Sequence, residues 1–389
     1  MASIKLKHSG GNGVIIAAPT SNPASDKTLT LPSDVDGTVV SKDSSNSLQN
    51  IAGINGGQLG NRNLVINGAM QVAQRGTSST NNGYGTVDRF EVSYTGTNES
   101  PTQEQGDVSS GTTPYTLGFR KALKITNGNQ TGGAGSADRI EVRTKLEAQD
   151  IADSGWNYTS ASSFVTISFW VKSSVAQNFY GRFLTSDGTA QRFKYETGSL
   201  TADTWTKVTK TIPGNSNLQF DNNANLGLMI SWYLFAGTDL TDSSALDTWA
   251  ASATGNRASD MTSTWYTTND ATFEITGVQL EVGSAATDFE HRSFGQELAL
   301  CQRYFEIGVH GNYGNVTGGG THKFYSQFKT QKRATPTLAI ISSQENYVSS
   351  VNIAADPSDA TLGCRIQGAV VATGDNKYID AKFSSSAEL

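Results

Sequence analysis

The sequence predicts an all-β protein organised around a jelly-roll β-sandwich. Charged residues make up only 16% of the 389 residues, and glycine occurs 40 times. A surface of uncharged polar residues with many glycines is typical of exposed sheets joined by turns. Between residues 61 and 293, apolar and polar residues alternate repeatedly, and helix signals are almost absent. The expected order is a short N-terminal β-attachment arm, the jelly-roll sandwich, one short helix and a small C-terminal β-domain.

The clearest strand runs from Phe164 to Lys172, where every second residue is apolar. One face of this strand is therefore expected to be core, and the other carries Trp170. Asp187-Gly188 predicts a tight hairpin turn, and Gly277 interrupts the last strand pattern as a β-bulge would. Further strands are expected over residues 179–184, 191–195, 205–212, 226–235 and 271–282. Many short strands with regular turns favour a two-sheet sandwich over residues 61–293.

The first 60 residues read as short extended pieces separated by glycine and proline. The pieces cover residues 4–6, 14–17, 29–31 and 38–40. They are too short to bury a core, so we expect them to pair with copies of themselves or with another protein. Residues 44–60 are rich in Ser, Asn and Gly and are expected to be a linker. Residues 1–60 are therefore interpreted as an attachment arm with its linker.

A helix is expected directly after the sandwich, over residues 294–308. Ser293 can cap it with Gln296 as the reciprocal partner, an apolar stripe follows, and Gly308 is expected to end it. Residues 309–389 are interpreted as a distal β-domain. Its strands are expected over residues 324–328, 338–341, 347–353, 362–366, 369–372 and 378–383.

Composition argues against several classes of function. The net charge is −6, with 29 basic and 35 acidic residues, and the two signs are interspersed. No basic stripe tracks a phosphate backbone, so no nucleic acid is expected as a partner. No segment is long and apolar enough to insert into a membrane. Cys301 and Cys364 are too few for a disulfide framework and are expected to be free thiols.

Known catalytic and cofactor motifs are not found in the sequence, and no catalytic residue, metal or cofactor is predicted. The four histidines show no metal-ligand spacing and are expected to be solvated loop residues. Asp34, Asp36 and Gly37 begin like a calcium loop that lacks its closing Glu, so a turn is favoured, and structural calcium in the sandwich loops is neither predicted nor excluded. Glutamates on or near strands leave glycoside hydrolysis open as a less favoured alternative. They are Glu141, Glu147, Glu274, Glu281 and Glu290.

Three aromatic residues are the candidate ligand-binding residues. Trp170 lies on the polar side of its strand, and Tyr233 and Phe235 lie opposite the apolar face of theirs. Aromatic rings on an open surface can stack against the apolar C–H faces of sugars. The alternative is that these rings are buried in a second layer or in a subunit interface.

Several segments resemble the tail fibres of tailed bacteriophages, especially marine phages that infect cyanobacteria and related hosts. The segments are NLVINGAMQVAQRG at 63–76, TVDRF at 86–90, ISFWVK at 167–172, ITGVQLEVG at 275–283, FEHRS at 289–293 and ELALCQRYF at 297–305. Residues 29–32 and 36–39 are similar to short β-repeats at the virion-attached end of such fibres. Residues 333–337 and 387–389 resemble the distal unit more weakly.

The resemblance implies a homotrimeric fibre of the virion, bound by its N-terminus to adaptor or nozzle proteins of the tail. Its jelly roll would be similar to carbohydrate-binding modules, and its function would be adhesion to a host-surface glycan or outer-membrane receptor. The resemblance supplies no catalytic residues, so the chain is not expected to be an enzyme. The chain also departs from the family pattern, because it has no long repetitive shaft. A purely structural tail component and a polysaccharide depolymerase remain as alternatives.

Overall fold

The computed structural model describes residues 61–389 except 317, 318 and 373, together with four short strands before residue 61. The chain divides into a unit of residues 1–54 and a unit of residues 55–389. In the first unit, β1 (Ser3–Lys7) pairs with β2 (Gly13–Ala17), and β3 (Ser41–Lys42) pairs with β4 (Leu48–Gln49), both antiparallel. The strands expected near residues 4–6 and 14–17 are therefore present, but they pair with each other within one chain. Residues 29–31 and 38–40 lie outside the described residues.

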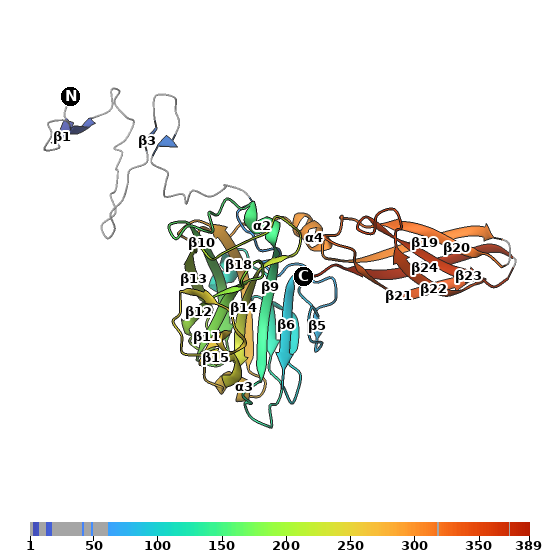
Figure 1. The fold of residues 1–389 in the computed structure, drawn as a ribbon, viewed down its shortest axis with the longest axis horizontal. Coiled ribbons are helices and arrows are strands. Elements are labelled where there is room, and N and C mark those ends of the chain that lie inside the picture. Colours follow the sequence, from blue (N-terminus) through green and yellow to red (C-terminus); the bar gives the residue numbers. More distant parts are fainter. Residues whose placement is uncertain are drawn as a thin grey trace. The chain divides into compact units, whose positions relative to one another are not determined.

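Two six-stranded antiparallel sheets form the sandwich of the second unit (Figure 1). The first sheet has the order β13-β10-β18-β8-β7-β5, and the second has the order β16-β12-β11-β14-β9-β6. The strands are β5 (Ser78–Ser79), β6 (Phe90–Thr95), β7 (Thr102–Asp107), β8 (Lys121–Thr126), β9 (Arg139–Glu147), β10 (Phe164–Ser173), β11 (Asn178–Thr185), β12 (Gln191–Ser199), β13 (Thr206–Pro213), β14 (Leu226–Ala236), β16 (Trp249–Ala251) and β18 (Thr272–Val282). The all-β class and the sandwich are confirmed.

The core lies between the two sheets and is built from alternate residues of their strands. Phe169 of β10 meets Trp232 of β14 edge to face, with ring centroids 5.6 Å apart. Strands β6 to β9 were not predicted individually. In β7 the sequence TQEQGD has no apolar alternation, so only its pairing with β8 and β5 identifies it as a strand. A short parallel pair, β15 (Thr241–Asp242) and β17 (Ala258–Ser259), lies in the connection between β14 and β18.

Helices in the described residues are short, and none is long and apolar enough to cross a membrane. They are α1 (Thr113–Thr116), α2 (Ala148–Ala152), α3 (Thr264–Thr267), α4 (Phe294–Gln302) and the 3₁₀ turns η1 (Thr238–Leu240) and η2 (Thr254–Asn256). Helix α4 has the expected capping box, in which the Ser293 hydroxyl accepts from the Gln296 amide. Its predicted end at Gly308 is wrong, because residues 305–316 pair as a strand. Cross-strand hydrogen bonds there outweigh the local helical pattern.

Residues from 305 onward form two three-stranded antiparallel sheets with the orders β19-β24-β21 and β20-β23-β22. The strands are β19 (Phe305–Val316), β20 (Thr321–Gln327), β21 (Thr337–Asn346), β22 (Val348–Ala355), β23 (Gly363–Val370) and β24 (Gly374–Ser386). The two strands expected at 362–366 and 369–372 are the single strand β23. A small core of Phe, Ile and Val side chains lies between the sheets, and Cys364 is part of it. Cys301 and Cys364 are free and buried, as expected.

Charged side chains join the sandwich to the distal sheets. Arg303, just after α4, donates two hydrogen bonds of 2.8 Å to Glu147 at the end of β9. Tyr304 donates to the same carboxylate over 2.6 Å. Near the C-terminus, Glu388 pairs with Arg89 and, at 3.0 Å, with Arg75. Segments 63–76, 86–90, 297–305 and 387–389, which carry part of the tail-fibre resemblance, therefore contribute side chains to this junction.

Candidate functional site

Trp170 occupies the middle of β10 on the outer face of the first sheet. In the strand register it lies opposite Lys207 of β13 on one side and Thr276 of β18 on the other. Its side chain is half-buried. The expectation that Trp170 stands on the polar face of its strand is therefore met, and its ring is reachable from solvent.

A β-bulge beside Trp170 shapes the floor of the site. The β10–β18 register shifts between Ser168 and Trp170, and Gly277 adopts a φ of +63° at this point. A Cβ atom on Gly277 would lie 2.7 Å from the Phe119 ring. Only glycine allows both this backbone conformation and the close approach of Phe119. The bulge expected from the Gly277 break is confirmed.

The wall of the site comes from the segment that links β18 to α4. Phe289 packs edge to face against Phe119, with centroids 4.9 Å apart and an interplanar angle of 71°. The ring of His291 lies 4.9 Å from Phe289, and its Nε2 is 2.9 Å from the carbonyl oxygen of Leu117. The rings of Phe119, Phe289 and His291 thus pack against one another beside Trp170.

Together these residues enclose a shallow cavity of about 240 Å³, which we call the Trp170 groove. It is lined by Leu117, Phe119, Ser168, Trp170, Lys207, Gly277, Thr287, Asp288, Phe289 and His291. Three polar groups of the lining have no hydrogen-bond or ion-pair partner among the described residues: the indole N–H of Trp170, the ammonium of Lys207 and the carboxylate of Asp288. An aromatic platform with unused donors and acceptors around it matches the needs of a sugar ring.

A ladder of alternating charges extends the same face beyond the groove. Lys172 lies 5.3 Å from the centre of the Trp205 ring and 2.9 Å from the carboxylate of Glu274. Two strands further on, Lys124 pairs with Glu104 at 3.4 Å. Trp205 is half-buried and offers a second indole on this face. Because the charges of the ladder are paired, its electrostatic field is weak. The groups of the Trp170 groove differ, because the Lys207 ammonium and the Asp288 carboxylate have no partner among the described residues.

Tyr233 and Phe235 lie on the second sheet, so the structure does not bring them together with Trp170. Tyr233 is 0% exposed, because Leu240 and Ala258 pack against it. The expectation that its ring stands on an open surface is therefore wrong. Phe235 is also buried and stacks on Tyr266 at 4.4 Å, beside a separate cavity of about 380 Å³. The connection between β14 and β18 covers this face, which strand periodicity alone does not reveal.

The sequence analysis missed the partners of Trp170: Lys207, Asp288, Phe289 and His291. Lys207 faces Trp170 only because β13 pairs with β10 in this register. Phe289 and His291 belong to the segment 289–293, which carries part of the family resemblance. That resemblance was the one feature of the sequence that could have indicated them as site residues. Their position opposite Trp170 depends on a contact between residues far apart in the chain.

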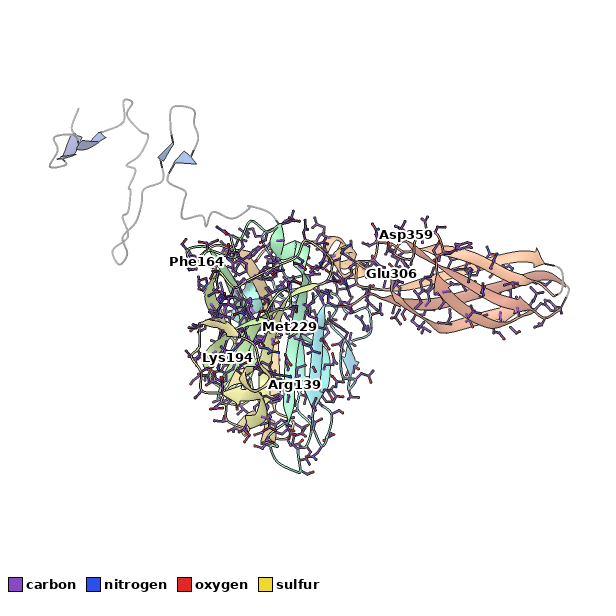
Figure 2. All side chains as sticks on the ribbon, viewed as in Figure 1. Arg139, Phe164, Lys194, Met229, Glu306 and Asp359 are labelled. Carbon is purple, nitrogen blue, oxygen red and sulfur yellow. The ribbon has the colours of Figure 1, made fainter. Side chains whose placement is uncertain are left out.

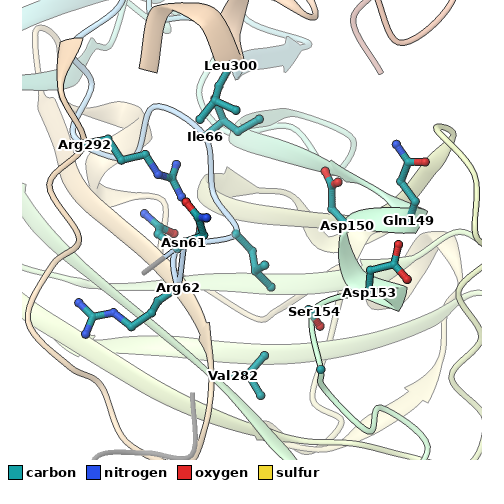
Figure 3. Close-up of a pocket in the computed structure, with 13 residues that line it drawn as sticks. Asn61, Arg62, Ile66, Gln149, Asp150, Asp153, Ser154, Val282, Arg292 and Leu300 are labelled. Carbon is teal, nitrogen blue, oxygen red and sulfur yellow. The ribbon is translucent and has the colours of Figure 1, made fainter. Parts of the chain in front are cut away.

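Another cavity, of about 600 Å³, lies where the described sandwich begins at Asn61 (Figure 3). Arg62 and Arg292 approach it from one side, and Asp150 and Asp153 from the other. Among the described residues, no aromatic ring lines it. Without a stacking platform it is a poorer sugar site than the Trp170 groove.

The five glutamates considered for glycoside hydrolysis each have local partners. Glu141 accepts from Ser231 over 2.6 Å, and Glu281 accepts from Thr287 over 2.6 Å. Glu147 binds Arg303 and Tyr304, Glu274 binds Lys172, and Glu290 binds the amide of Asn63. Each carboxylate thus already has a structural role.

The histidines of the distal sheets differ from the expectation of solvated loops. His310 lies on β19 and His322 on β20, and both rings flank Phe324, at 5.0 and 6.5 Å. His322 is buried, because it alternates with the exposed residues of its strand. In the part of the chain that the structure describes, no three His, Cys, Asp or Glu side chains group as metal ligands do.

Comparison with known proteins gives matches among solved structures only. No family model and no curated protein matches the chain. The enzymatically active domain of tailspike protein 4 of bacteriophage CBA120 is 12% identical, with a TM-score of 0.29, over 57% of this chain and 21% of that one. This chain thus spans about a fifth of that tailspike domain.

Two carbohydrate-binding domains match at a similar level. One is the N-terminal cellulose-binding domain of Cellulomonas fimi β-1,4-glucanase C, 12% identical with a TM-score of 0.26, over 56% of this chain and 99% of that one. The other is the family 11 carbohydrate-binding module of Clostridium thermocellum, 11% identical with a TM-score of 0.24, over 55% and 98%. At these identities and TM-scores the likeness says nothing about what this chain binds.

Proposed function

We propose that this chain is a receptor-binding fibre protein of a bacteriophage tail, and that it adheres to a host-surface glycan through the Trp170 groove. The observation that carries the proposal is the combination of a solvent-reachable indole with the unpaired Lys207 ammonium and Asp288 carboxylate. Stacking on Trp170 would supply affinity, and hydrogen bonds to the two charged groups would orient the sugar hydroxyls.

The shallow groove fits adhesion by many weak sites. A cavity of about 240 Å³ holds only part of a polysaccharide, so each site is expected to be weak. In a homotrimer, three such sites would act together and raise the effective affinity without any new contact. Residues 1–54 form a unit of their own, as an N-terminal arm that docks on tail proteins would.

The direct test is binding of the labelled full-length protein to a glycan array and to polysaccharides extracted from candidate host bacteria. Saturable binding is expected. Trp170→Ala should weaken it about tenfold or more, because the platform contributes roughly 1.5–3 kcal/mol of apolar burial. Trp170→Phe keeps part of the aromatic platform, so its glycan affinity should lie between those of Trp170→Ala and the unaltered protein.

Tyr325→Ala serves as the matched control, since it removes an exposed aromatic ring from the distal sheets. It should bind glycan as the unaltered protein does. Equal binding by Trp170→Ala and the unaltered protein would place the receptor site elsewhere. No binding at all by a well-folded protein would favour a purely structural tail component.

The same samples test the remaining parts of the proposal. Light scattering should give a mass of three chains, and a monomer would contradict the trimeric fibre. The length of the polysaccharide should not change on incubation, because no catalytic role is assigned to any residue. A progressive shortening would instead identify a depolymerase.

A further inference from the structure

Arg182, on the outer face of the second sheet, is unusual because it is buried without a hydrogen-bond or ion-pair partner among the described residues. It lies in the middle of β11 and is only 5% exposed. No described residue accepts a hydrogen bond from it or forms an ion pair with it, and its Nε is buried without a partner. Its one polar contact is with the face of Tyr233, 5.7 Å from the ring centre. Buried arginines normally have acceptors, and a missing acceptor indicates water or an ion at that place.

Two further cations lie beside Arg182. Lys194 of β12 is directly opposite Arg182 in the strand register, and Arg192 is two residues away on the same face. Like charges directly opposite each other destabilise an antiparallel pair. Lys194 is fully buried and Arg192 is 3% exposed, so solvent screens neither charge well.

The polar partners of Lys194 and Arg192 come from residues 242–244. Lys194 pairs with Asp242 at 2.5 Å, and Arg192 donates to the hydroxyl of Ser244 over 2.6 Å. Among the described residues, Asp242 is the only carboxylate within ion-pair distance of the three cations. Burial lowers the pKa of Arg192, Asp242 opposes this change, and the charge of Arg182 adds to it. Among the described residues, Lys194 is the one member of this group with an ion-pair partner, and Glu141, on the β14 side of Arg182, is hydrogen-bonded to Ser231.

Polar groups of the chain flank the three cations on two sides. Residues 242–244 stand over Lys194 and Arg192, while Ser231 of β14 lies next to Arg182 on the other flank. Lys194 and Met229 are labelled on this face in Figure 2. The terminal nitrogens of Arg182 are not among the fully buried unpartnered atoms. Arg182 is 5% exposed, so a small part of its side chain still meets solvent.

We propose that Arg182, Arg192 and Lys194 form a subsite for an oxyanion: a carboxylate, or a sulfate or phosphate ester. Guanidinium groups present planar pairs of donors that match two oxygens of such a group. The ligand would supply the acceptors that Arg182 lacks and would relieve the repulsion between Arg182 and Lys194. Acidic polysaccharides carry these groups, and so do free inorganic anions. The subsite lies on the opposite sheet from the Trp170 groove and does not depend on the function proposed there.

The test measures anion binding by the full-length protein. Sodium sulfate should raise the unfolding temperature saturably, beyond the effect of sodium chloride at the same ionic strength. Calorimetric titration with a polyuronate oligosaccharide and with its carboxyl-reduced form separates the two sources of the oxyanion. Binding of the polyuronate alone assigns the subsite to an acidic glycan, and binding of sulfate alone assigns it to free anions.

Arg182→Gln is the decisive variant, because it removes the charge and keeps much of the side-chain length. It should weaken anion binding about tenfold or more, as expected for lost charge-assisted hydrogen bonds. Without ligand, its unfolding temperature should stay level or rise, because Lys194 loses a like-charged neighbour. A merely structural arginine would give a lower unfolding temperature and no change in anion affinity.

Two controls keep this test separate from that of the Trp170 groove. Arg143→Gln alters an arginine on the same face that is already paired with Glu91 at 2.6 Å, and it should leave anion affinity unchanged. Trp170→Ala should also leave it unchanged. Equal effects of sulfate and chloride on the unaltered protein, with no polyuronate binding, would overturn the proposal. So would unchanged affinity in Arg182→Gln.

Discussion

At the scale of single residues, the Trp170 groove depends on Gly277, which has no side chain. Gly277 combines a positive φ with a close approach to the Phe119 ring. The ring fills the space that a Cβ atom would occupy, and Phe119 in turn supports Phe289 and His291. One glycine therefore positions the floor and, through it, the wall of the groove.

Gly277→Ala is expected to lower the free energy of unfolding by about 2 kcal/mol, since the new methyl group meets Phe119 and the left-handed backbone becomes strained. It should also weaken glycan binding, because Phe119 must move. Urea unfolding measures the first effect and titration with the bound glycan measures the second. Unchanged stability would mean that the bulge relaxes without cost.

Gly295→Ala provides the matched control in α4. Apart from its chain neighbours and the backbone of the helix itself, no heavy atom lies within 4 Å of the position that its Cβ would take, and its backbone is helical. Alanine there reduces the conformational entropy of the unfolded chain, so the protein should gain about 0.5 kcal/mol in urea unfolding. A loss of stability would show that α4 needs a glycine for a reason beyond its backbone.

At the scale of elements, the short helix α4 is held by partners at both ends. Ser293 and Gln296 cap its start, and Glu297 accepts a hydrogen bond from the amide of Asn67 over 2.5 Å. Just beyond its end, Arg303 and Tyr304 bind Glu147 at the end of β9. Burial works against ionisation of Glu147, but the hydrogen bonds from Arg303 and Tyr304 hold its pKa below the usual value. The negative charge of Glu147 is thus part of how the helix is attached to the sandwich.

Glu147→Gln is expected to destabilise the protein by about 2 kcal/mol, less than the loss of a fully buried ion pair because the Arg303 side chain remains 30% exposed. Urea unfolding at pH 7 measures the change. Glu104→Gln is the control, since its pair with Lys124 is open to solvent and should contribute close to zero. If both variants lost the same stability, the junction would contribute nothing specific.

At the scale of the whole molecule, the last residues of the chain return to the sandwich. Glu388 pairs with Arg89, whose side chain is almost fully buried, and with Arg75. Arg333 donates to the carbonyl oxygens of Ala387 and Glu388 over 2.5 and 2.8 Å. The distal sheets are therefore attached through both their first and their last residues, so the loss of either attachment should affect the stability of the whole unit.

Glu388→Gln tests this attachment directly. It leaves Arg89 buried without its ion-pair partner, which costs about 3 kcal/mol or more. Differential scanning calorimetry should show the whole transition at a lower temperature. The control is Glu345→Gln, an exposed glutamate of β21, which should leave the transition unchanged. An unshifted transition in Glu388→Gln would show that the returning tail is dispensable.

The dependence of stability on pH follows from two groups of carboxylates with opposite pKa shifts. Burial raises the pKa of Asp88 to about 6, and burial together with Glu147 raises the pKa of Asp150 to about 6. As the pH falls, these carboxylates bind protons at a higher pH in the folded state than in the unfolded state. Stability should therefore rise as the pH falls from 7 to 5. Glu91 and Glu147 have lowered pKa values despite their burial, so the stability they contribute is lost below about pH 4.5.

Asp88→Asn should remove about half of the rise between pH 7 and 5, because Asp150 remains. Urea unfolding at intervals of half a pH unit measures this slope, which is at most about 1.4 kcal/mol per pH unit for each proton bound. Asp107→Asn is the exposed control and should leave the slope unchanged. An unaltered slope in Asp88→Asn would mean that Asp88 is already ionised in the folded protein at pH 5.

Features that depend on neighbouring residues could be predicted from local sequence patterns. The alternation of residues 164–172 placed Trp170 on the outer face, Gly277 marked the bulge, and Ser293 with Gln296 marked the start of α4. Backbone conformation and side-chain direction at these places are set within a few residues, so a local pattern is sufficient. The class of the fold followed from the repetition of such patterns.

The packing of the whole chain sets which outward faces remain open and which distant residues meet. Trp170 and Tyr233 both point away from the core, but the chain between β14 and β18 covers Tyr233 and leaves Trp170 reachable. Glu147 and Arg303 are 156 residues apart in sequence and form one contact. Gly308 follows a helical pattern, yet it pairs in β19 with Phe383 of β24. Cross-strand pairing and burial act between distant segments, and no local periodicity encodes their partners.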